Sequence, residues 1–331
     1  MYLSKHHNPS QNNLDMCETN EIDDFIKTNS NSKEFSCSSN TYKPSSLRVS
    51  TMTATCKINS NIDLEKASKI LISNIKNNGD IKYLEFGNVT AGVSNKNISE
   101  KKAKKKKVFY NQMTILVKVH ENMHNNIKLF NNGAISMTGL KSEKDGKNSV
   151  AILLKYLKSG YDTDNNCLDN KDASISNFDI VLINSDYYIG YEIKRSELHQ
   201  LLINKYKIFS SYEPCIYPGV NSKFYWNKDY MDKEYLGKCY CKNMCNGKGC
   251  GKGDGNCKKI TISAFQSGSV IITGARNIDQ IKAAYKFINK IFKDNYELLK
   301  KQNAPFLEIE DKTPNVINTN NIIYLKKSNI Y

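Results

Sequence analysis

The chain has 331 residues and a formal net charge of +15 at pH 7, which is long enough for two domains or for one internally duplicated domain with tails. It has no run of about 18 consecutive apolar residues, the signature of a membrane-spanning helix. The first residues also lack the apolar segment of a signal peptide, so we expect an intracellular protein whose ten cysteines are thiols or metal ligands rather than disulfides.

The positive charge is unevenly distributed along the chain. Residues 1–46 hold four lysines against six acidic residues, so residues 47–331 carry a net charge of +17. A surface of this charge favours a polyanionic partner, most simply nucleic acid, although a membrane surface would also attract it.

The first elements are expected after a polar N-terminal segment. Residues 1–46 lack periodicity and are rich in Ser and Asn, which predicts a disordered tail. Alternating β-branched residues over 47–58 predict a strand. The pair Ser60-Asn61 precedes a predicted helix over 62–75, supplies its capping residue and is followed by acidic residues in the first turn.

Residues 87–108 interrupt this pattern with Gly, Asn and Ser and end in a run of lysines at 101–107. A solvated loop is the plain interpretation of such a run. A phosphate-binding arm or a nuclear-localisation signal has the same composition, so these alternatives stay open.

One twelve-residue phrase occurs twice, at 130–141 and 265–276. Each copy has Phe, then Gly three residues later, then Thr-Gly and a final cation: Phe130, Gly133, Thr138, Gly139 and Lys141 in the first copy, Phe265, Gly268, Thr273, Gly274 and Arg276 in the second. An aromatic residue, a Gly-containing turn and an alternating run predict a β-hairpin.

The second strand of each predicted hairpin carries no charge on either face. Residues on one face alternate with those on the other: Ser136 and Thr138 against Ile135 and Met137, then Ile271 and Thr273 against Val270 and Ile272. Such a strand either lies in a sheet covered on both sides or has a smooth face reserved for a ligand.

A predicted helix follows each phrase, the first after the capping box Ser142 to Asp145 and the second after the capping residue Asn277. The order strand, helix, strands, phrase, helix thus occurs twice, over 47–158 and 178–302. A linker at 159–177 separates the repeats, a Cys-rich insertion at 228–258 interrupts the second, and a loose tail covers 303–331. We expect an α+β fold of two pseudo-symmetric repeats sharing one antiparallel sheet.

The two phrases, together with the stretch FSSYEPCIYPG at 209–219, resemble the motifs of the TATA-box-binding-protein family, the last being its stirrup. The resemblance covers roughly 47–158 and 178–296. It implies a curved, saddle-like sheet of ten strands, with helices on the convex face, that lies in the minor groove and bends DNA. The large insertions and the skewed composition suggest a diverged, viral version, a giant-virus protein being one candidate.

The resemblance also implies what the protein does. It would be a transcription initiation factor and not an enzyme, would bind AT-rich promoter DNA as a monomer, and would recruit RNA polymerase machinery through a factor similar to transcription factor IIB. Such a protein would act in the nucleus or, if viral, in a cytoplasmic viral factory or virion. An architectural or repressive minor-groove protein of the same fold is the alternative.

Individual positions follow from the same resemblance. The rings that intercalate into DNA would be Phe130, Phe265, Tyr217 and Tyr110. Phe109 is an alternative to Tyr110. For Phe130 and Phe265 the alternative is a place in the core of the hairpin. The minor-groove face would contain Leu47, Val49, Ser136, Thr138, Leu182, Asn184, Ile271 and Thr273. Phosphate contacts would come from Lys118, Lys141, Lys223 and Arg276, and partner contacts from Glu213 and Ile216.

Several positions depart from the family pattern. The family places one Asn per repeat at the centre of the groove contact, and the alignment puts Leu47 and Leu182 there. Asn184 would substitute if the register is shifted. Ala134 and Ser269 replace family lysines, and Cys215 replaces an acid on the stirrup. Preference for a standard TATA box is therefore less expected than minor-groove binding itself.

The sequence His120-Glu-Asn-Met-His124 matches the H-E-x-x-H pattern of zinc peptidases, which needs a helix so that both histidines share one face. Here it lies between predicted strands and precedes two asparagines, so we interpret it as a hairpin turn and keep the peptidase as a remote alternative.

The insertion at 228–258 contains five cysteines that could hold a structural zinc ion, namely Cys239, Cys241, Cys245, Cys250 and Cys257. Their spacing lacks paired C-x-x-C units, so a plain flexible loop is an equal alternative. No other cofactor is expected.

Overall fold

The computed structural model describes residues 42–75, 79–93, 109–121, 123–230 and 237–301. The predictions made for residues 1–41, for the lysine run at 101–107 and for residues 303–331 fall outside these ranges. No helix among the described residues is long and apolar enough to cross a membrane.

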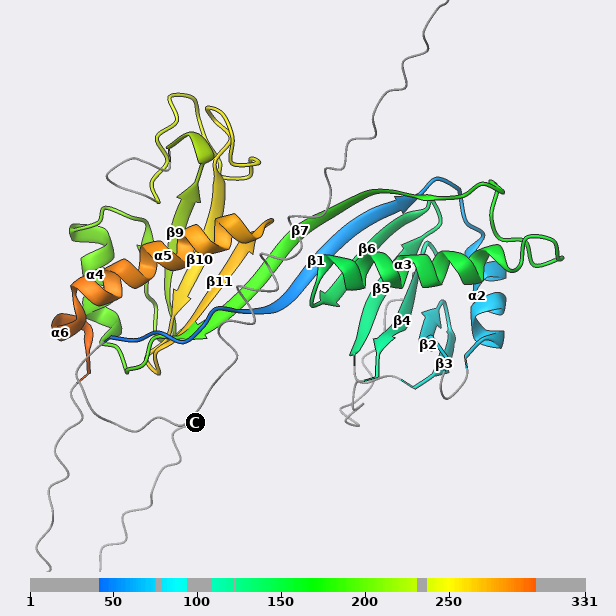
Figure 1. The fold of residues 1–331 in the computed structure, drawn as a ribbon, viewed down its shortest axis with the longest axis horizontal. Helices are drawn as coiled ribbons and strands as arrows, with labels where there is room; N and C mark the ends of the chain where they lie inside the picture. The colour runs from blue at the N-terminus through cyan, green and yellow to red at the C-terminus, as the bar shows by residue number, and fades with distance from the viewer. Residues whose placement is uncertain (1–41, 76–78, 94–108, 122, 231–236, 302–331) are drawn as a thin grey trace, which may run out of the picture. The chain divides into compact units, whose positions relative to one another are not determined.

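One antiparallel sheet of eleven strands runs through both repeats (Figure 1), in the order β3-β2-β4-β5-β6-β1-β7-β11-β10-β9-β8. The long strands β1 and β7 pair with each other and join the repeats. The strands are β1 Arg48–Ile58, β2 Ile81–Phe86, β3 Val89–Gly92, β4 Gln112–His120, β5 Met123–Phe130, β6 Ala134–Leu140, β7 Ile175–Tyr188, β8 Ser210–Ser211, β9 Val220–Trp226, β10 Lys258–Ala264 and β11 Ser269–Ala275. The predicted fold class, an α+β fold built on one antiparallel sheet, is confirmed.

Side chains cap the N-termini of the helices α2, α3 and α5. They are α2 Leu64–Ser73, α3 Glu143–Lys158, α4 Arg195–Asn204, α5 Ile278–Asp294, α6 Tyr296–Leu299 and the short 3-10 helix η1 Lys228–Tyr230. The Ser142 hydroxyl accepts a hydrogen bond from the Asp145 amide at 3.1 Å, and the Asn277 side chain accepts one from the Gln280 amide at 3.0 Å. The cap of α2 is Asp63 and not Ser60 or Asn61, because its carboxylate accepts from the amides of Glu65 and Lys66.

The helices α3 and α5 cover one face of the sheet, α3 over the strands of the first repeat and α5 over those of the second (Figure 1). The alternation predicted for the two hairpins produces this layer. The apolar residues of the strands and of the helices are buried in the same core, including Ile135, Met137, Val270 and Ile272 from the hairpins, Val150, Leu153 and Leu157 from α3, and Ile281, Ala284 and Ile288 from α5.

Two details differ from the sequence prediction. The sheet has eleven strands instead of ten, because β3 forms within the segment 87–108 and pairs with β2. The last residues of the presumed tail, 42–46, pack against the second repeat. The Tyr42 ring meets Tyr191 edge-on at 6.1 Å, and the Ser45 amide donates to the Tyr188 carbonyl at 2.7 Å.

The linker between the repeats also has a structural role. Within the predicted linker 159–177, Cys167, Leu168 and Ala173 are buried in the common core. Leu168 forms a bridge to Ile62, just before α2, and β7 has already begun at Ile175. The segment therefore packs onto the first repeat.

Candidate nucleic-acid interface

The sheet has a second face that α3 and α5 do not cover, which we call the open face. Its side chains alternate with the buried ones along each strand, and all are at least partly exposed. They include Thr51, Thr53 and Thr55 on β1; Glu85 on β2; Thr114, Leu116 and Lys118 on β4; His124, Asn126 and Lys128 on β5; Ser136 and Thr138 on β6; Asp179, Leu182, Asn184 and Asp186 on β7; Lys223 and Tyr225 on β9; Lys259 and Thr261 on β10; Ile271 and Thr273 on β11.

The strand register identifies the centre of this face. Thr138 of the first phrase pairs with Thr53, and Thr273 of the second pairs with Asn184, so Thr53 and Asn184 are equivalent positions of the two repeats. Across the β1–β7 junction, Thr51 pairs with Asn184 and Thr53 with Leu182. The two pairs are therefore related to each other by the duplication, with Thr51 the counterpart of Leu182.

Asn184 links three strands at this centre. Its side-chain amide donates to the Thr51 hydroxyl at 3.2 Å, and the Thr273 hydroxyl donates to its carbonyl oxygen. The centre of the open face is thus built from neutral amide and hydroxyl groups. At the equivalent positions, the second repeat has Asn184 and the first repeat has Thr53.

Leu47 and Val49 do not belong to the open face, contrary to the assignment made from the sequence. The register of β1 shifts between Val49 and Thr51, and Val49 pairs with Ser185, which is buried on the helix side. A bulge of this kind moves the preceding side chains to the other face. Leu47 is accordingly only 7% exposed, within the core.

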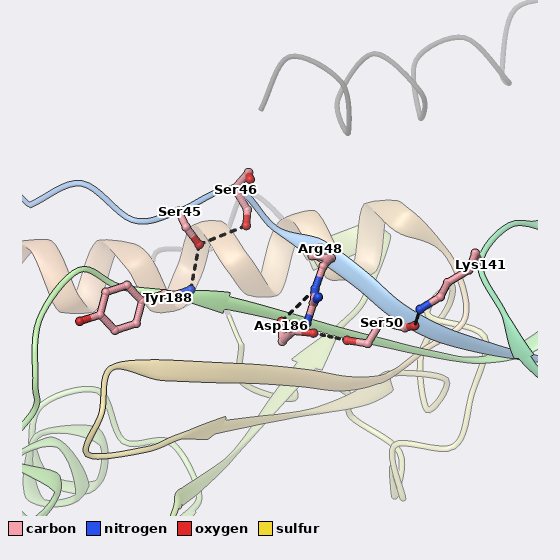
Figure 2. A network of polar contacts seen from close by, with 7 residues as sticks. All are labelled: Ser45, Ser46, Arg48, Ser50, Lys141, Asp186 and Tyr188. Atoms are coloured by element: carbon pink, nitrogen blue, oxygen red, sulfur yellow. Dashed lines mark hydrogen bonds and ion pairs between the residues drawn. The ribbon is translucent and has the colours of Figure 1, made fainter. Parts of the chain in front are cut away.

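The same shift brings Arg48 and Ser50 to Asp186 on β7 (Figure 2). The Arg48 Nη2 atom lies 2.9 Å from a carboxylate oxygen of Asp186, and the Ser50 hydroxyl donates to the other oxygen. Lys141 donates to the Ser50 carbonyl. Asp186 is therefore neutralised, which lowers its repulsion for a polyanion. Glu85 and Asp179 also lie on this face, because they pair with Thr114 and Thr55. Sequence analysis missed Arg48 and Asp186, because only the register of β1 against β7 places them opposite each other.

An aromatic pair stands at the β10–β11 hairpin of the second repeat. The rings of Tyr217 and Phe265 meet edge-on with centroids 5.7 Å apart, and 39% of Tyr217 is exposed. Gly219 makes room for them, since a Cβ atom there would lie 2.9 Å from Tyr217 and 3.1 Å from Phe265. Arg195 holds the two segments together by donating to the Pro218 carbonyl and, at 3.1 Å, to the Gln266 side chain.

The corresponding rings of the first repeat are arranged differently. Phe130 is half-buried at the end of β5 and pairs with Gln112 of β4. Two residues before Gln112, Tyr110 is 69% exposed and lies against Gly87, and its neighbour Phe109 is 52% exposed. Both candidate partners of Phe130 are therefore exposed near the same end of β4.

The four predicted phosphate ligands lie in different settings. Lys118 and Lys223 belong to the open face, whereas Lys141 and Arg276 follow the hairpins and are exposed. Lys223 donates to the Thr261 hydroxyl at 2.9 Å, and burial together with the nearby Lys259 lowers its pKa. Lys223 and Lys259 thus place two positive charges close together in the second repeat. Lys128 and Lys259 are open-face cations that sequence analysis did not single out.

The predicted partner contacts lie on the stirrup, at the surface. The amides of Ile216 and Tyr217 both donate to the Glu213 carbonyl, at 2.9 and 2.8 Å, which closes a tight turn. Ile216 is 85% exposed at the tip of that turn.

The histidine motif lies in a hairpin turn, as predicted. His120 ends β4 and His124 lies in β5, so the two do not share a helix face as the peptidase mechanism requires. The His120 Nε2 atom instead lies 3.1 Å from the Asp145 carboxylate.

In the Cys-rich insertion, the sulfur atoms of Cys239, Cys241, Cys245 and Cys257 all lie within 4.8 Å of one another. Cys250, the fifth candidate, is exposed and does not join them.

The chain is similar to several known proteins. A profile of the family described as "Transcription factor TFIID (or TATA-binding protein, TBP)" matches residues 178–295. A protein of Acanthamoeba polyphaga mimivirus named "TATA-box-binding protein-like" is 35% identical over 284 residues, which cover 80% of this chain and 70% of that protein. A solved structure titled "Methanococcus jannaschii TBP" aligns with a TM-score of 0.44 and 18% identity over 75% of this chain and 98% of that one. The mimivirus alignment is longer than either repeat, so it spans both.

Proposed function

This chain belongs to the TATA-box-binding-protein family and is a DNA-binding transcription factor of that type, and from this premise we propose that it binds AT-rich promoter DNA in the minor groove through the open face and bends it. The single observation that carries the proposal is the composition of that face. A neutral centre of Thr51, Thr53 and Asn184 is flanked by lysines and ends, in the second repeat, at a partly exposed aromatic pair.

The neutral centre suits the minor groove of A·T base pairs. That groove presents only acceptor atoms at A·T pairs, whereas a G·C pair adds the guanine amino group. The hydroxyls of Thr51 and Thr53 and the amide of Asn184 can donate to these acceptors, and their small size lets the backbone approach the base edges. Lysines at the flanks meet the phosphates on either side.

The aromatic rings suit the ends of the contact. Minor-groove proteins that kink DNA insert apolar side chains between base pairs, at a cost of a few kcal/mol per unstacked step that wider contact offsets. We assign this role to Tyr217 and Phe265 in the second repeat and to Phe130 with Tyr110 in the first. As members of the family do, the protein would act as a monomer on DNA and carry out no bond chemistry.

A bending assay tests the proposal. An AT-rich duplex labelled at both ends should show closer ends by energy transfer when the protein binds, and a G·C duplex should not. Phe265→Ala and Tyr217→Ala should abolish the change while circular dichroism shows a folded protein. Ile216→Ala, which truncates the neighbouring exposed residue, is the matched control and should bend DNA normally. Normal bending by the Phe265 variant would contradict the proposed insertion of this ring between base pairs.

The stirrup supports a further part of the proposal, the recruitment of RNA polymerase machinery through a factor similar to transcription factor IIB. Ile216 and Glu213 lie near Tyr217, one of the rings proposed to insert into DNA, but on an exposed turn. A protein can therefore bind them while DNA occupies the open face. Ile216→Asp should abolish transcription in a reconstituted system without changing DNA bending. An architectural or repressive role predicts instead that promoter transcription does not depend on this residue.

A further inference from the structure

We propose that the insertion between β9 and β10 binds one zinc ion through the thiolates of Cys239, Cys241, Cys245 and Cys257. The inference does not depend on the DNA-binding role, because it concerns a segment outside the open face.

The geometry of the four sulfur atoms fits a single tetrahedral ion. With a zinc–sulfur distance of about 2.3 Å, the sulfur atoms of such a site lie about 3.8 Å apart. Here the Cys257 sulfur lies 3.3 Å from that of Cys241 and 3.8 Å from that of Cys239, and all four fall within 4.8 Å of one another. A centre with several metal ions would need its ligands further apart. A tetrahedral set of four thiolates suits a single zinc ion, and iron is the other metal that such a set binds.

Hydrogen bonds from the backbone and from one side chain hold Cys257 in place. Cys257 directly precedes β10 and is buried, and its carbonyl accepts from the Gly249 amide at 3.1 Å. The Asn227 side chain donates to its sulfur at 3.6 Å. Such donors orient a thiolate and stabilise its negative charge, as the outer contacts of metal sites do.

The described part of the insertion has hydrogen bonds but no apolar core of its own. Between residues 237 and 257 the buried residues are three glycines and Cys257, so no apolar side chain forms a core there. The base of the loop is fixed by bridges from Gly237 to Tyr225 and from Lys248 to Lys258. Above it, Asp254 accepts from the amides of Lys242 and Asn243 at 2.7 and 3.1 Å. A metal ion would supply the missing core, because binding free energy in such a segment acts as folding free energy.

The charge of the loop fits the proposed centre. Four thiolates around one divalent ion carry a net charge of about −2. Residues 237–257, which contain the four ligands, include four lysines and a single acid. The lysines therefore compensate the charge of the metal centre, which a loop of thiols without metal would not need.

Metal analysis of the purified full-length chain tests the proposal. Mass spectrometry of the metals should find about one zinc per chain in the wild-type protein and in Cys250→Ser, the matched control from the same loop. The double variant Cys241→Ser/Cys245→Ser should lose it. Equal zinc in all three proteins, loss of zinc in Cys250→Ser, or iron in place of zinc would overturn the assignment.

A second measurement uses the wild-type chain alone and so does not depend on the variants folding. Cobalt added to the metal-depleted protein should give the intense visible absorption of a tetrahedral thiolate site, and zinc should displace it. A weak, octahedral spectrum would overturn the proposal. So would alkylation under non-reducing conditions that finds these four cysteines paired in two disulfides. None of these readouts involves DNA, so they stand or fall separately from the proposed function.

Discussion

Asn184 occupies a central position where the two repeats offer different chemistry to a bound duplex. Its side-chain amide is a donor at the centre of the open face, where the first repeat has the hydroxyl of Thr53. The contacts to Thr51 and Thr273 fix the orientation of this amide. A donor fixed before binding gains more from a base-edge acceptor than one that must first be ordered.

We therefore predict that Asn184→Ala raises the Kd for an AT-rich duplex by about 5- to 10-fold, since a net hydrogen bond contributes about 1 kcal/mol and Thr51 also loses its partner. Thr53→Asn, which places an amide at the equivalent position, should keep or tighten binding. Fluorescence anisotropy with labelled duplexes measures both. An Asn184→Ala protein with unchanged affinity would show that this amide does not face the bases.

His124 couples the open face to pH. It pairs with Lys118 across β4 and β5, and burial, then Lys82 and Lys118, lower its pKa below the ordinary value of 6.5. Its neutral form is thus favoured before DNA binds. A phosphate beside Lys118 would raise this pKa, so binding would take up a proton.

The sign of the pH effect follows from this uptake. His124 has a lower pKa in the free protein and a higher pKa in the DNA complex. Affinity should rise as the pH falls through the interval between these two values, by up to about tenfold per unit of difference between them. Above the higher value it should be constant. His124→Gln should flatten the profile, and His199→Gln on α4 should leave it unchanged. A profile that persists in the His124 variant would exclude this residue as the source.

At the scale of elements, the stirrup and the hairpin act as one unit through Gly219. Both rings of the aromatic pair lie against this residue, at distances that leave no room for a side chain. Its backbone does not need a positive φ angle, so the requirement is one of space alone.

Gly219→Val should accordingly displace Tyr217 and Phe265 and reduce DNA bending several-fold while the sheet stays folded. End-to-end energy transfer measures the bend, and circular dichroism checks the fold. Ala151→Val provides the comparison, since it enlarges an exposed side chain on α3 to the same valine, on the covered side of the sheet, and should bend DNA as the wild type does. Equal bending by both variants would argue against a role for the ring pair.

The elements themselves could be read from the sequence where their signals are local. Alternation defined the hairpins at 130–141 and 265–276, and side-chain caps defined α3 and α5, because these patterns depend on neighbours a few residues apart. The bulge between Val49 and Thr51 could not be read this way. It is a feature of the pairing of β1 with β7, and it moved Leu47 and Val49 to the core side.

The same limit applies to the insertion between β9 and β10. Five cysteines marked it as a candidate metal site, but a Gly-rich loop has no periodicity that fixes its path. Only the folded structure therefore shows that the thiols of Cys239, Cys241, Cys245 and Cys257 converge and that Cys250 lies apart from them.

At the scale of the whole molecule, the duplication is exact in register but unequal in charge. Lys128 on β5 corresponds to Ser263 on β10, and His124 corresponds to Lys259, by the offset that relates Phe130 to Phe265. The two halves of the open face therefore present their cations at different places. A duplex with unequal flanks can then be bound in a preferred direction, because phosphate contacts fix the orientation of a protein on DNA.

The salt dependence of binding counts the cations that contact phosphates. Each phosphate neutralised changes the slope of log K against log salt by about 0.9, so Lys223→Ala should lower the slope by about one and leave the preference for A·T pairs unchanged. Lys118→Ala should do the same from the other half, and the double variant should lower it by about two, since the sites are independent. Lys155→Ala removes an equal charge from α3 on the covered side and should leave the slope unaltered. Anisotropy titrations over a series of salt concentrations give the slopes; equal losses in all three single variants would mean that DNA responds to net charge and not to the open face.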